Sequence, residues 1–173
     1  MNTTTAILAL GANLGDRWAS MQGAIYELDQ DPAIHINSIS SLYETDPVGG
    51  PEQPVYFNAI LSLDTSLSAH QLLAAAHEIE DSWHRTREVR WGARTLDIDL
   101  ITYGALIYSD DILTVPHPRA HEREFVLVPW LEIDPDAELP GRGSVAGLTT
   151  FDASGAVRKI KQQLIFNLSP LES

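Results

Sequence analysis

Residues 90–101 read RWGARTLDIDLI, and the second half of this stretch predicts a β-strand. Apolar residues at positions 96, 98 and 100 alternate with Asp97 and Asp99, which is the period-two pattern of a half-buried strand. A strand places both aspartates on one face, with their Cα atoms roughly 6.6 Å apart. Two neighbouring carboxylates repel each other unless a cation compensates them. Mg²⁺ suits this position, because it binds carboxylate oxygens together with the phosphates of a substrate.

Arginines precede the same strand. Arg90 and Arg94 come directly before it, and six of the nine arginines fall between positions 85 and 123. The planar guanidinium group binds phosphate oxygens in pairs. Acidic residues and arginines within a few positions therefore predict a phosphoryl-transfer site. Either feature alone has a simpler explanation, because an Asp-x-Asp pair is often a solvated strand face and clustered arginines often form surface ion pairs.

The composition narrows the possible classes of protein. A net charge of −13 argues against a nucleic-acid or anionic-membrane partner held by bulk electrostatics. The absence of cysteine excludes disulfides, thiolate metal sites and cysteine catalysis. Because the sequence has no long apolar run and begins MNTTT, without the basic region of a signal peptide, we expect a cytoplasmic protein. We also expect it to be a monomer. The length predicts a single domain over residues 1–173, with residues 141–173 as a peripheral C-terminal extension.

The expected elements alternate in the order β-α-β-β-α-β. Helices are expected from an Asp16 cap to Leu28 and from a Ser68–Gln71 capping box to Trp83. This order predicts an α+β ferredoxin-like sandwich, in which helices pack on a mainly antiparallel sheet. A doubly wound parallel sheet is disfavoured, because two strands follow each other without a helix between them. The strands are expected at residues 5–10, 34–45, 56–63 and 96–101.

The remaining chain is less regular. Pro118 is expected to open a helix over residues 118–128 that carries Arg123 and Phe125. Residues 129–140 are expected to be irregular, and residues 151–173 to form a short hairpin or a loosely held tail.

One strand carries a second candidate binding surface. Tyr56 and Asn58 share a face of the strand at residues 56–63, beside a Gly/Pro-rich loop at residues 46–54. Such a face suits a flat heterocycle, and an ordinary half-buried strand edge explains it equally well.

Four motifs then follow one another along the chain. They are GANLGD at residues 11–16, YETDPVG at 43–49, RWGARTLDID at 90–99 and VPHPR at 115–119. In sequence and order they resemble the 6-hydroxymethyl-7,8-dihydropterin pyrophosphokinase family, and the resemblance runs from Ala6 to Leu139. The resemblance implies a ferredoxin-like fold and transfer of the β,γ-pyrophosphoryl unit of ATP to the hydroxymethyl group of the pterin, with release of AMP.

The resemblance also implies roles for individual residues. The implied catalytic residues are Arg85, Arg94, Asp97 and Asp99, and the two aspartates would hold two Mg²⁺ ions together with ATP. The implied ATP-binding residues are Glu80, Arg87, Arg90, Trp91, Ile101, His117 and Arg123. The implied pterin-binding residues are Thr45, Val48, Tyr56, Asn58 and Phe125, with the two aromatic rings on either side of the pterin.

Two other classes stay open as alternatives. A metal-dependent glycosyltransferase also uses an Asp-x-Asp pair, although this chain is short for that class. A nucleotide- or pterin-binding protein without catalysis would have lost Asp97, Asp99 or Arg94, and all three are present. His117 is a candidate general base, with a structural or adenine-contacting histidine as the favoured alternative.

Overall fold

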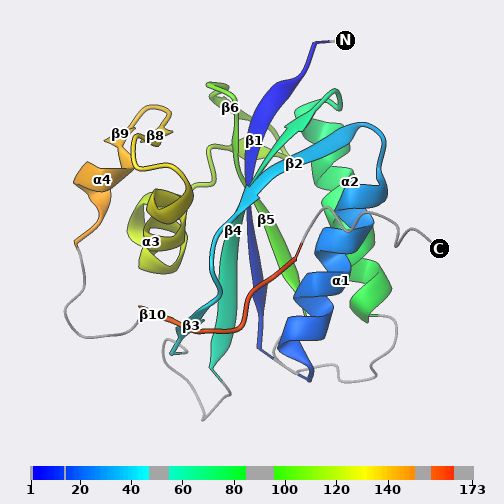
Figure 1. Ribbon diagram of the computed structural model, residues 1–173. Coiled ribbons are helices and arrows are strands. Elements are labelled where there is room, and N and C mark those ends of the chain that lie inside the picture. The colour runs from blue at the N-terminus through cyan, green and yellow to red at the C-terminus, as the bar shows by residue number, and fades with distance from the viewer. Residues whose placement is uncertain (1, 14, 47–54, 85–95, 151–156, 166–173) are drawn as a thin grey trace.

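The computed structural model describes residues 2–13, 15–46, 55–84, 96–150 and 157–165, without the side chain of His84 (Figure 1). The first part of the chain contains β1 (Thr4–Ala12), α1 (Arg17–Gln30), β2 (Ile34–Ile39), β3 (Tyr43–Thr45), β4 (Tyr56–Thr65), α2 (Ala69–His84) and β5 (Asp97–Tyr103). The second part contains β6 (Tyr108–Ser109), β7 (Thr114–Val115), the 3₁₀ helix η1 (Ala120–Glu122), α3 (Glu124–Ile133), β8 (Glu138–Leu139), β9 (Gly143–Ser144), α4 (Val145–Leu148) and β10 (Val157–Lys159). Within these described ranges, no helix has the length and apolar character needed to cross a membrane.

β1 lies in the interior of the main antiparallel sheet. The strand order is β10-β3-β4-β1-β5, and β2 also pairs with β4. β1 pairs with β4 from Thr4 to Ala12 and with β5 from Ala6 to Gly11. Together with α1 and α2, these strands form the β-α-β-β-α-β arrangement, which confirms the predicted ferredoxin-like α+β fold.

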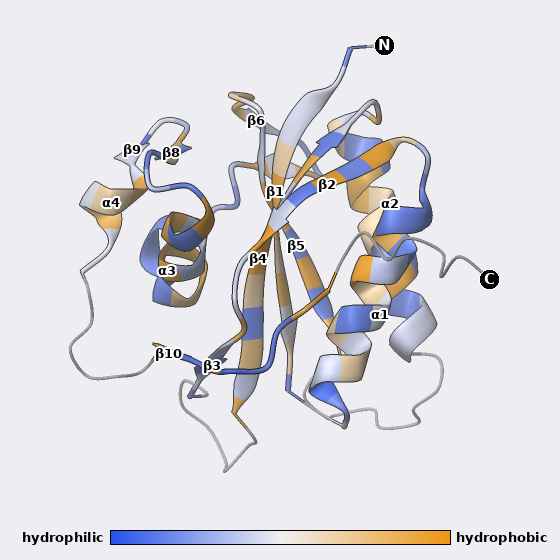
Figure 2. Ribbon diagram, viewed as in Figure 1, coloured by the Kyte–Doolittle hydropathy of each residue, from blue (hydrophilic) through white to orange (hydrophobic). Residues whose placement is uncertain are grey.

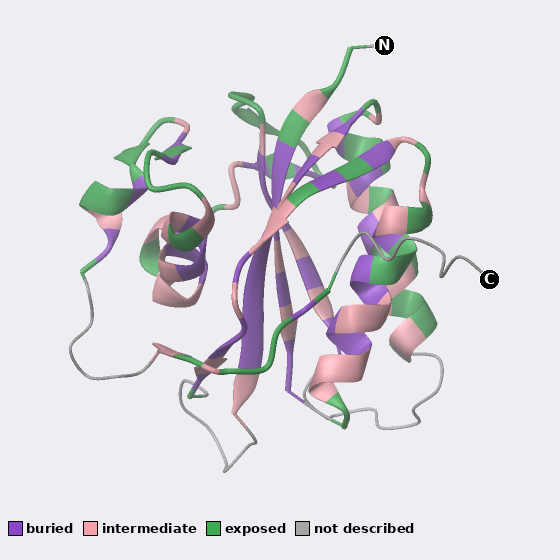
Figure 3. Cartoon of the chain, viewed as in Figure 1, coloured by how far each residue is buried: buried purple, intermediate pink, exposed green. Residues whose placement is uncertain are grey.

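Helices cover both faces of this sheet. α1 and α2 lie on one face, and α3 lies on the other (Figure 1). Because successive strand residues point to opposite faces, Leu8 and Leu10 of β1 enter the core under α1 and α2, whereas Ile7 enters the core under α3. Figure 3 shows that β4 is buried along most of its length, as expected for a strand between two cores.

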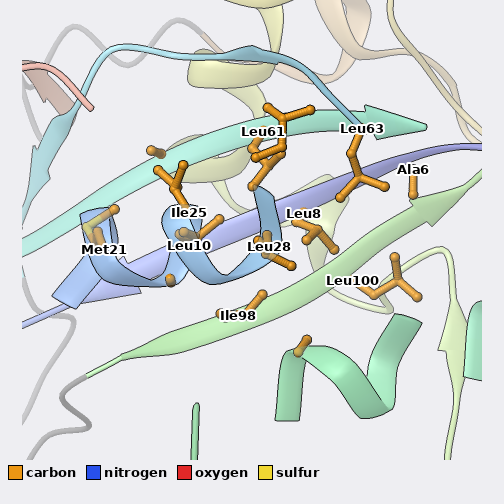
Figure 4. Packing of buried hydrophobic residues seen from close by; sticks show 14 of the residues in the cluster. Ala6, Leu8, Leu10, Met21, Ile25, Leu28, Leu61, Leu63, Ile98 and Leu100 are labelled. Carbon is orange, nitrogen blue, oxygen red and sulfur yellow. The ribbon is translucent and has the colours of Figure 1, made fainter. Parts of the chain in front are cut away.

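The larger core holds α1 on the sheet. Figure 4 shows Met21, Ile25 and Leu28 of α1 packed against Leu8 and Leu10 of β1. Burial of each such side chain contributes about 1.5–3 kcal/mol. This contact therefore fixes the helix that follows the first turn of the chain.

α1 and α2 begin where the sequence predicts. Asp16 Oδ1 accepts a hydrogen bond from Ala19 N at 2.9 Å at the start of α1. Before α2, Gln71 N donates to Ser68 Oγ at 3.1 Å, and Ser68 N donates to Gln71 Oε1 at 2.8 Å. This reciprocal pair is a capping box, which satisfies two backbone donors that the helix itself leaves unpaired.

The strand predicted at residues 34–45 is wrong as a single element. β2 ends at Ile39, β3 begins at Tyr43, and β3 pairs with a different part of β4. At the break, Ser40 N donates to Ile60 O at 2.8 Å, and Ser40 Oγ accepts from Ile60 N at 2.9 Å. The serine side chain takes a bond that a regular ladder gives to the backbone, and the strand is interrupted there.

The helix predicted at residues 118–128 begins and ends later than expected. η1 comes first, Arg123 is extended between the two helices, and α3 continues to Ile133. Pro129 therefore lies inside a helix, in a region predicted to be irregular. A proline in a helix interior costs about 3 kcal/mol. Burial of neighbouring α3 side chains such as Trp130 in the second core offsets this cost.

β10 adds a strand at the edge of the main sheet, where residues 157–159 pair antiparallel with β3. The chain then reaches α1, where Trp18 Nε1 donates to Gln163 O at 3.0 Å, and Leu164 joins the larger core. The prediction of a hairpin or a loosely held tail is therefore wrong for residues 157–165. A single domain with a peripheral extension from residue 141 stays a prediction.

Candidate active site

Asp97 and Asp99 lie on the face of β5 that is turned toward α3. Figure 2 shows hydrophilic and hydrophobic residues alternating along this strand, and Ile98 is buried in the core on the opposite face. The predicted period-two arrangement is therefore confirmed. In β1, which pairs with both β5 and β4, Gly11 lies opposite Asp97 of β5 on one side and opposite Asn58 of β4 on the other.

A pocket of about 490 Å³ opens over these strands and is called the first pocket below. It brings together seven residues with a predicted role: Thr45, Tyr56, Asn58, Asp97, Asp99, Arg123 and Phe125. The rest of its lining consists of Ala9, Leu10, Gly11, Asp46, Arg119 and Glu122. The fold thus assembles one site from four strands and from the segment around η1 and α3.

Asn58 has a fixed orientation at the base of the first pocket. Its Nδ2 donates to Thr45 Oγ1 at 2.7 Å, and both residues are buried. Gly11 makes room for it, because a Cβ atom at this position would lie 3.1 Å from Asn58 Oδ1. A carboxamide offers two N–H donors and an acceptor oxygen, so one bond to Thr45 leaves capacity for a ligand.

Arg123 connects the acidic and the aromatic parts of the first pocket. Its Nη1 lies 3.7 Å from Asp99 Oδ2, and its Cζ lies 5.5 Å from the centroid of the Phe125 ring. The Asp99 side chain is 43% exposed, so solvent weakens this ion pair, while the ring contact helps to orient the guanidinium. The arginine can therefore turn from Asp99 to an incoming anion at a small free-energy cost.

A second pocket, of about 280 Å³, adjoins the first at Asp99, which lines both. One wall belongs to α2 and includes Glu80, and another wall, formed by residues after β6, includes His117. Both residues are predicted to bind ATP. The other lining residues are Leu73, His77, Ile98, Leu100, Ile112, Leu113, Thr114 and Pro118.

His117 is held by two backbone contacts. Its N donates to Ile101 O at 2.9 Å, and its Nδ1 accepts from Arg119 N at 3.2 Å. Burial lowers the pKa of His117; the Asp99 carboxylate opposes this shift, and the charges of Arg123 and Arg119 add to it. The imidazole is therefore neutral at pH 7, and because Nδ1 accepts a hydrogen bond, its proton lies on Nε2.

The structure does not bring the side chain of Ile101 into either pocket. This residue is fully buried in the second core, and its carbonyl accepts the hydrogen bond from His117. Six further residues with predicted roles lie outside the described parts of the chain: Val48, Arg85, Arg87, Arg90, Trp91 and Arg94.

Several residues that line the pockets have no role in the sequence-based prediction. Gly11 lies in the first of the four motifs, GANLGD, but its closeness to Asn58 depends on strand pairing. Arg119 belongs to the VPHPR motif and to the six arginines between positions 85 and 123, and either feature could have identified it as a site residue. His77 lies three residues before Glu80 on α2, and this spacing places the two on one helix face.

The donor atoms of the first pocket fit one kind of metal site. Among the described residues, there is no group of three or more His, Asp or Glu side chains that could hold a metal ion. Asp97 and Asp99 instead present two carboxylates to the pocket. One or two carboxylates, completed by phosphates and water, are the typical protein contribution to bound Mg²⁺. These residues therefore fit Mg²⁺ that arrives with a nucleotide.

Paired aspartates and arginines in a pocket are typical of enzymes that transfer phosphoryl groups. A family model described as 7,8-dihydro-6-hydroxymethylpterin-pyrophosphokinase (HPPK) matches residues 7–135. The chain belongs to this family.

Individual relatives agree with this family. The chain is 41% identical over 155 residues to 2-amino-4-hydroxy-6-hydroxymethyldihydropteridine pyrophosphokinase of Methylorubrum extorquens, covering 90% of this chain and 98% of the relative. It is 44% identical over 128 residues to the protein of the same name from Bacillus subtilis, covering 74% of this chain and 77% of the relative. A crystal structure of Plasmodium falciparum HPPK-DHPS with pteroate matches 85% of this chain with a TM-score of 0.67 at 14% identity. Only 42% of that solved chain is covered, and the likeness shows the fold alone.

Proposed function

We propose that the two pockets are the pterin site and the ATP site of a pyrophosphokinase and that Asp99 lies where the two substrates meet. As a member of this family, the chain transfers pyrophosphate from ATP to the hydroxymethyl group of 6-hydroxymethyl-7,8-dihydropterin, in folate biosynthesis, and AMP is released. The observation that carries the assignment of the pockets is the position of Asp99, which lines both of them.

The first pocket is the proposed pterin site. Tyr56 and Phe125 supply aromatic surfaces from two different elements, and a flat heterocycle gains burial and stacking between such rings. Asn58, oriented by Thr45, supplies an amide group for the hydrogen-bonding edge of the ring. Val48 belongs to this set by resemblance, and its role stays a prediction.

The second pocket is the proposed ATP site. Glu80 lies on one wall, and His117, neutral with its proton on Nε2, offers a donor from the other. Arg123 lies beside Asp99, where it can bind phosphate oxygens as charge develops on them. Arg85, Arg87, Arg90, Trp91 and Arg94 are proposed to complete the phosphate side, on the strength of the resemblance.

Asp97 and Asp99 are the proposed ligands of two Mg²⁺ ions that bind with ATP. When bound, the ions neutralise phosphate charge and lower the pKa of a hydroxyl group. The two carboxylates orient the triphosphate toward the first pocket, since both line it. His117 is a poor general base in this arrangement, because its Nδ1 already accepts from Arg119 N. We therefore assign it to nucleotide binding.

The proposal also covers the oligomeric state, the location and the partners of the protein. We propose a monomer that works in the cytoplasm without a nucleic-acid or membrane partner. The net charge of −13 supports the absence of polyanionic partners.

The direct test is to incubate the protein with ATP, Mg²⁺ and 6-hydroxymethyl-7,8-dihydropterin and to identify the nucleotide product. AMP formed in proportion to the pterin product is the expected result. ADP would indicate an ordinary kinase, and no turnover would favour a binding protein. Repeating the assay with the pterin omitted measures ATP hydrolysis, which should be a small fraction of the transfer rate.

A further inference from the structure

Asp110 organises the turn between β6 and β7. Its Oδ1 accepts from Ile112 N at 2.8 Å and from Leu113 N at 2.7 Å. Asp110 N in turn donates to Leu113 O at 2.8 Å. These three bonds close the turn on itself, and both Ile112 and Leu113 line the second pocket.

The other oxygen of the same carboxylate reaches a different element. Asp110 Oδ2 accepts from Tyr108 OH at 2.8 Å and lies 2.7 Å from His70 Nε2. The rings of His70 and Tyr108 also meet edge to face, with centroids 5.6 Å apart. Asp110, His70 and Tyr108 are called the Asp110 cluster below.

The helical position of His70 links the Asp110 cluster to the pocket. His70 belongs to α2, and Leu73, His77 and Glu80 follow it at spacings of three, four and three residues. Such spacings place these four residues along one stripe of the helix. The last three of them line the second pocket. The Asp110 cluster therefore joins the α2 wall of this pocket to the wall formed by residues 112–114, 117 and 118.

Asp110 also holds Ile112, an apolar residue that is largely exposed. It is 75% exposed, although it is a large apolar side chain that lines the pocket. The hydrogen bond from its N to Asp110 Oδ1 holds its backbone in place, although most of the residue is exposed. An exposed isoleucine at a pocket wall gains free energy when a flat apolar ligand face covers it.

We propose that the Asp110 cluster is a set of positioning residues that fixes the separation of the two walls of the second pocket and holds Ile112 against the nucleotide base. The proposal rests on the assignment of this pocket to ATP. The cluster acts through the walls: the carboxylate bridges α2 and the turn, and Ile112 makes the contact with the ligand.

Asp110→Ala tests this role through ligand binding as well as turnover. We expect the dissociation constant of a non-hydrolysable ATP analogue with Mg²⁺, measured by calorimetry, to rise about ten-fold. KM for ATP should rise by the same factor, while KM for the pterin and kcat stay within about two-fold of wild type. Ile112→Ala should raise the dissociation constant of the analogue by about three-fold, since it removes only the contact between Ile112 and the base. Asp110→Asn keeps the acceptor for the two backbone N–H groups and should restore part of the lost affinity.

The neighbouring residue provides the matched control. Asp111 is exposed and lines neither pocket, so Asp111→Ala should bind the analogue as wild type does. Unchanged analogue affinity in a folded Asp110→Ala variant overturns the proposal, as does an equal rise in both KM values. If Asp110→Ala does not fold, His70→Ala removes the bond between α2 and Asp110, and an unchanged affinity for the analogue in that variant overturns the proposal.

The outcomes also separate this proposal from the proposed function. If wild type binds the analogue but forms no AMP, the proposed function fails and the cluster is still judged by binding. If wild type forms AMP and Asp110→Ala binds the analogue normally, the cluster proposal fails alone.

Discussion

Asp99 and Arg123 form an ion pair, with 3.7 Å between Oδ2 and Nη1, at the boundary of the two pockets. Both side chains are partly exposed, so the pair contributes little to stability. Its effect is on orientation: the two charges lie side by side where we propose that the triphosphate binds. A cation can then take the carboxylate while a phosphate oxygen takes the guanidinium.

The first prediction concerns the charge of Asp99. Asp99→Asn keeps the shape of the side chain and removes the charge proposed to bind Mg²⁺. We expect kcat to fall about 10²–10³-fold, with the unfolding transition close to that of wild type. AMP formation at increasing Mg²⁺ concentrations is the measurement, and Asp111→Asn is the control for a change of charge nearby. Wild-type turnover by Asp99→Asn at every Mg²⁺ concentration would rule out the metal role.

The second prediction concerns the close approach of Gly11 and Asn58. Gly11→Ala places a Cβ atom 3.1 Å from Asn58 Oδ1, which is tighter than an ordinary contact, so the carboxamide that Thr45 orients must shift by a few tenths of an ångström. We expect KM for the pterin to rise about ten-fold, with KM for ATP unchanged. Steady-state kinetics with each substrate varied in turn will measure this.

A double variant identifies the route of this effect. If Gly11→Ala acts through Asn58, combining it with Asn58→Ala should raise KM for the pterin no further than Asn58→Ala alone. Fully additive effects would contradict this explanation.

The third prediction concerns the start of α2. Ser68→Ala removes the side-chain acceptor for Gln71 N. The free energy of unfolding should fall by about 1 kcal/mol, as is typical for loss of an N-cap. Urea unfolding gives this value, and kcat should not change, because Glu80 lies at the other end of the helix. A variant as stable as wild type would show that the capping box is not a stabilising contact.

The fourth prediction concerns pH and the contacts of Glu132, which joins α3 to Tyr43 and Ser41. Burial acts to raise the pKa of Glu132, but hydrogen bonds from Tyr43 and Ser41 outweigh it, and the pKa lies below its ordinary value of 4.5. A lowered carboxyl pKa stabilises the folded state fully above the unfolded-state pKa, and this stabilisation is lost as the pH falls through the folded-state pKa. Glu132→Gln should therefore be less stable than wild type at neutral pH, with a difference that shrinks below pH 4.5.

Urea unfolding of both proteins from about pH 7 down to about pH 3 will measure that difference. Glu138→Gln is a suitable control, because Glu138 is exposed on β8. A difference that is constant over the whole range would contradict the role of the Glu132 charge.

Local signals were sufficient for the elements that carry the site. The alternation around Asp97 and Asp99 predicts both the strand and the shared face of the two carboxylates, because side-chain direction in a strand depends only on spacing. The Ser68–Gln71 box likewise predicts the start of α2, since its bonds join residues three apart.

The features that the sequence did not reveal depend on contacts between distant residues. The break at Ser40 requires Ile60, which is twenty positions away, and the pairing of β10 with β3 requires an edge that exists only in the folded sheet. Pro129 continues a helix because its neighbours are buried, and intrinsic propensity favours the opposite outcome.

The site also combines features that the sequence predicts with features that depend on contacts between distant residues. Resemblance assigns Glu80 and His117 to one ligand, but their meeting in one pocket follows from how α2 packs against β5. The contact between Gly11 and Asn58 has no local signal at all, because it arises from the register of β1 and β4.

β1 separates the strand that carries Tyr56 and Asn58 from the strand that carries the two aspartates. Neighbouring strands are about 4.8 Å apart, so β4 and β5 are spaced by roughly 9.6 Å. In the proposed arrangement, the pterin binds over β4 and the triphosphate over β5, so the backbone hydrogen bonds of the sheet set the distance between the two binding sites. Substitutions of pocket side chains can lower the affinity for the pterin or for ATP, but they do not change the spacing between β4 and β5.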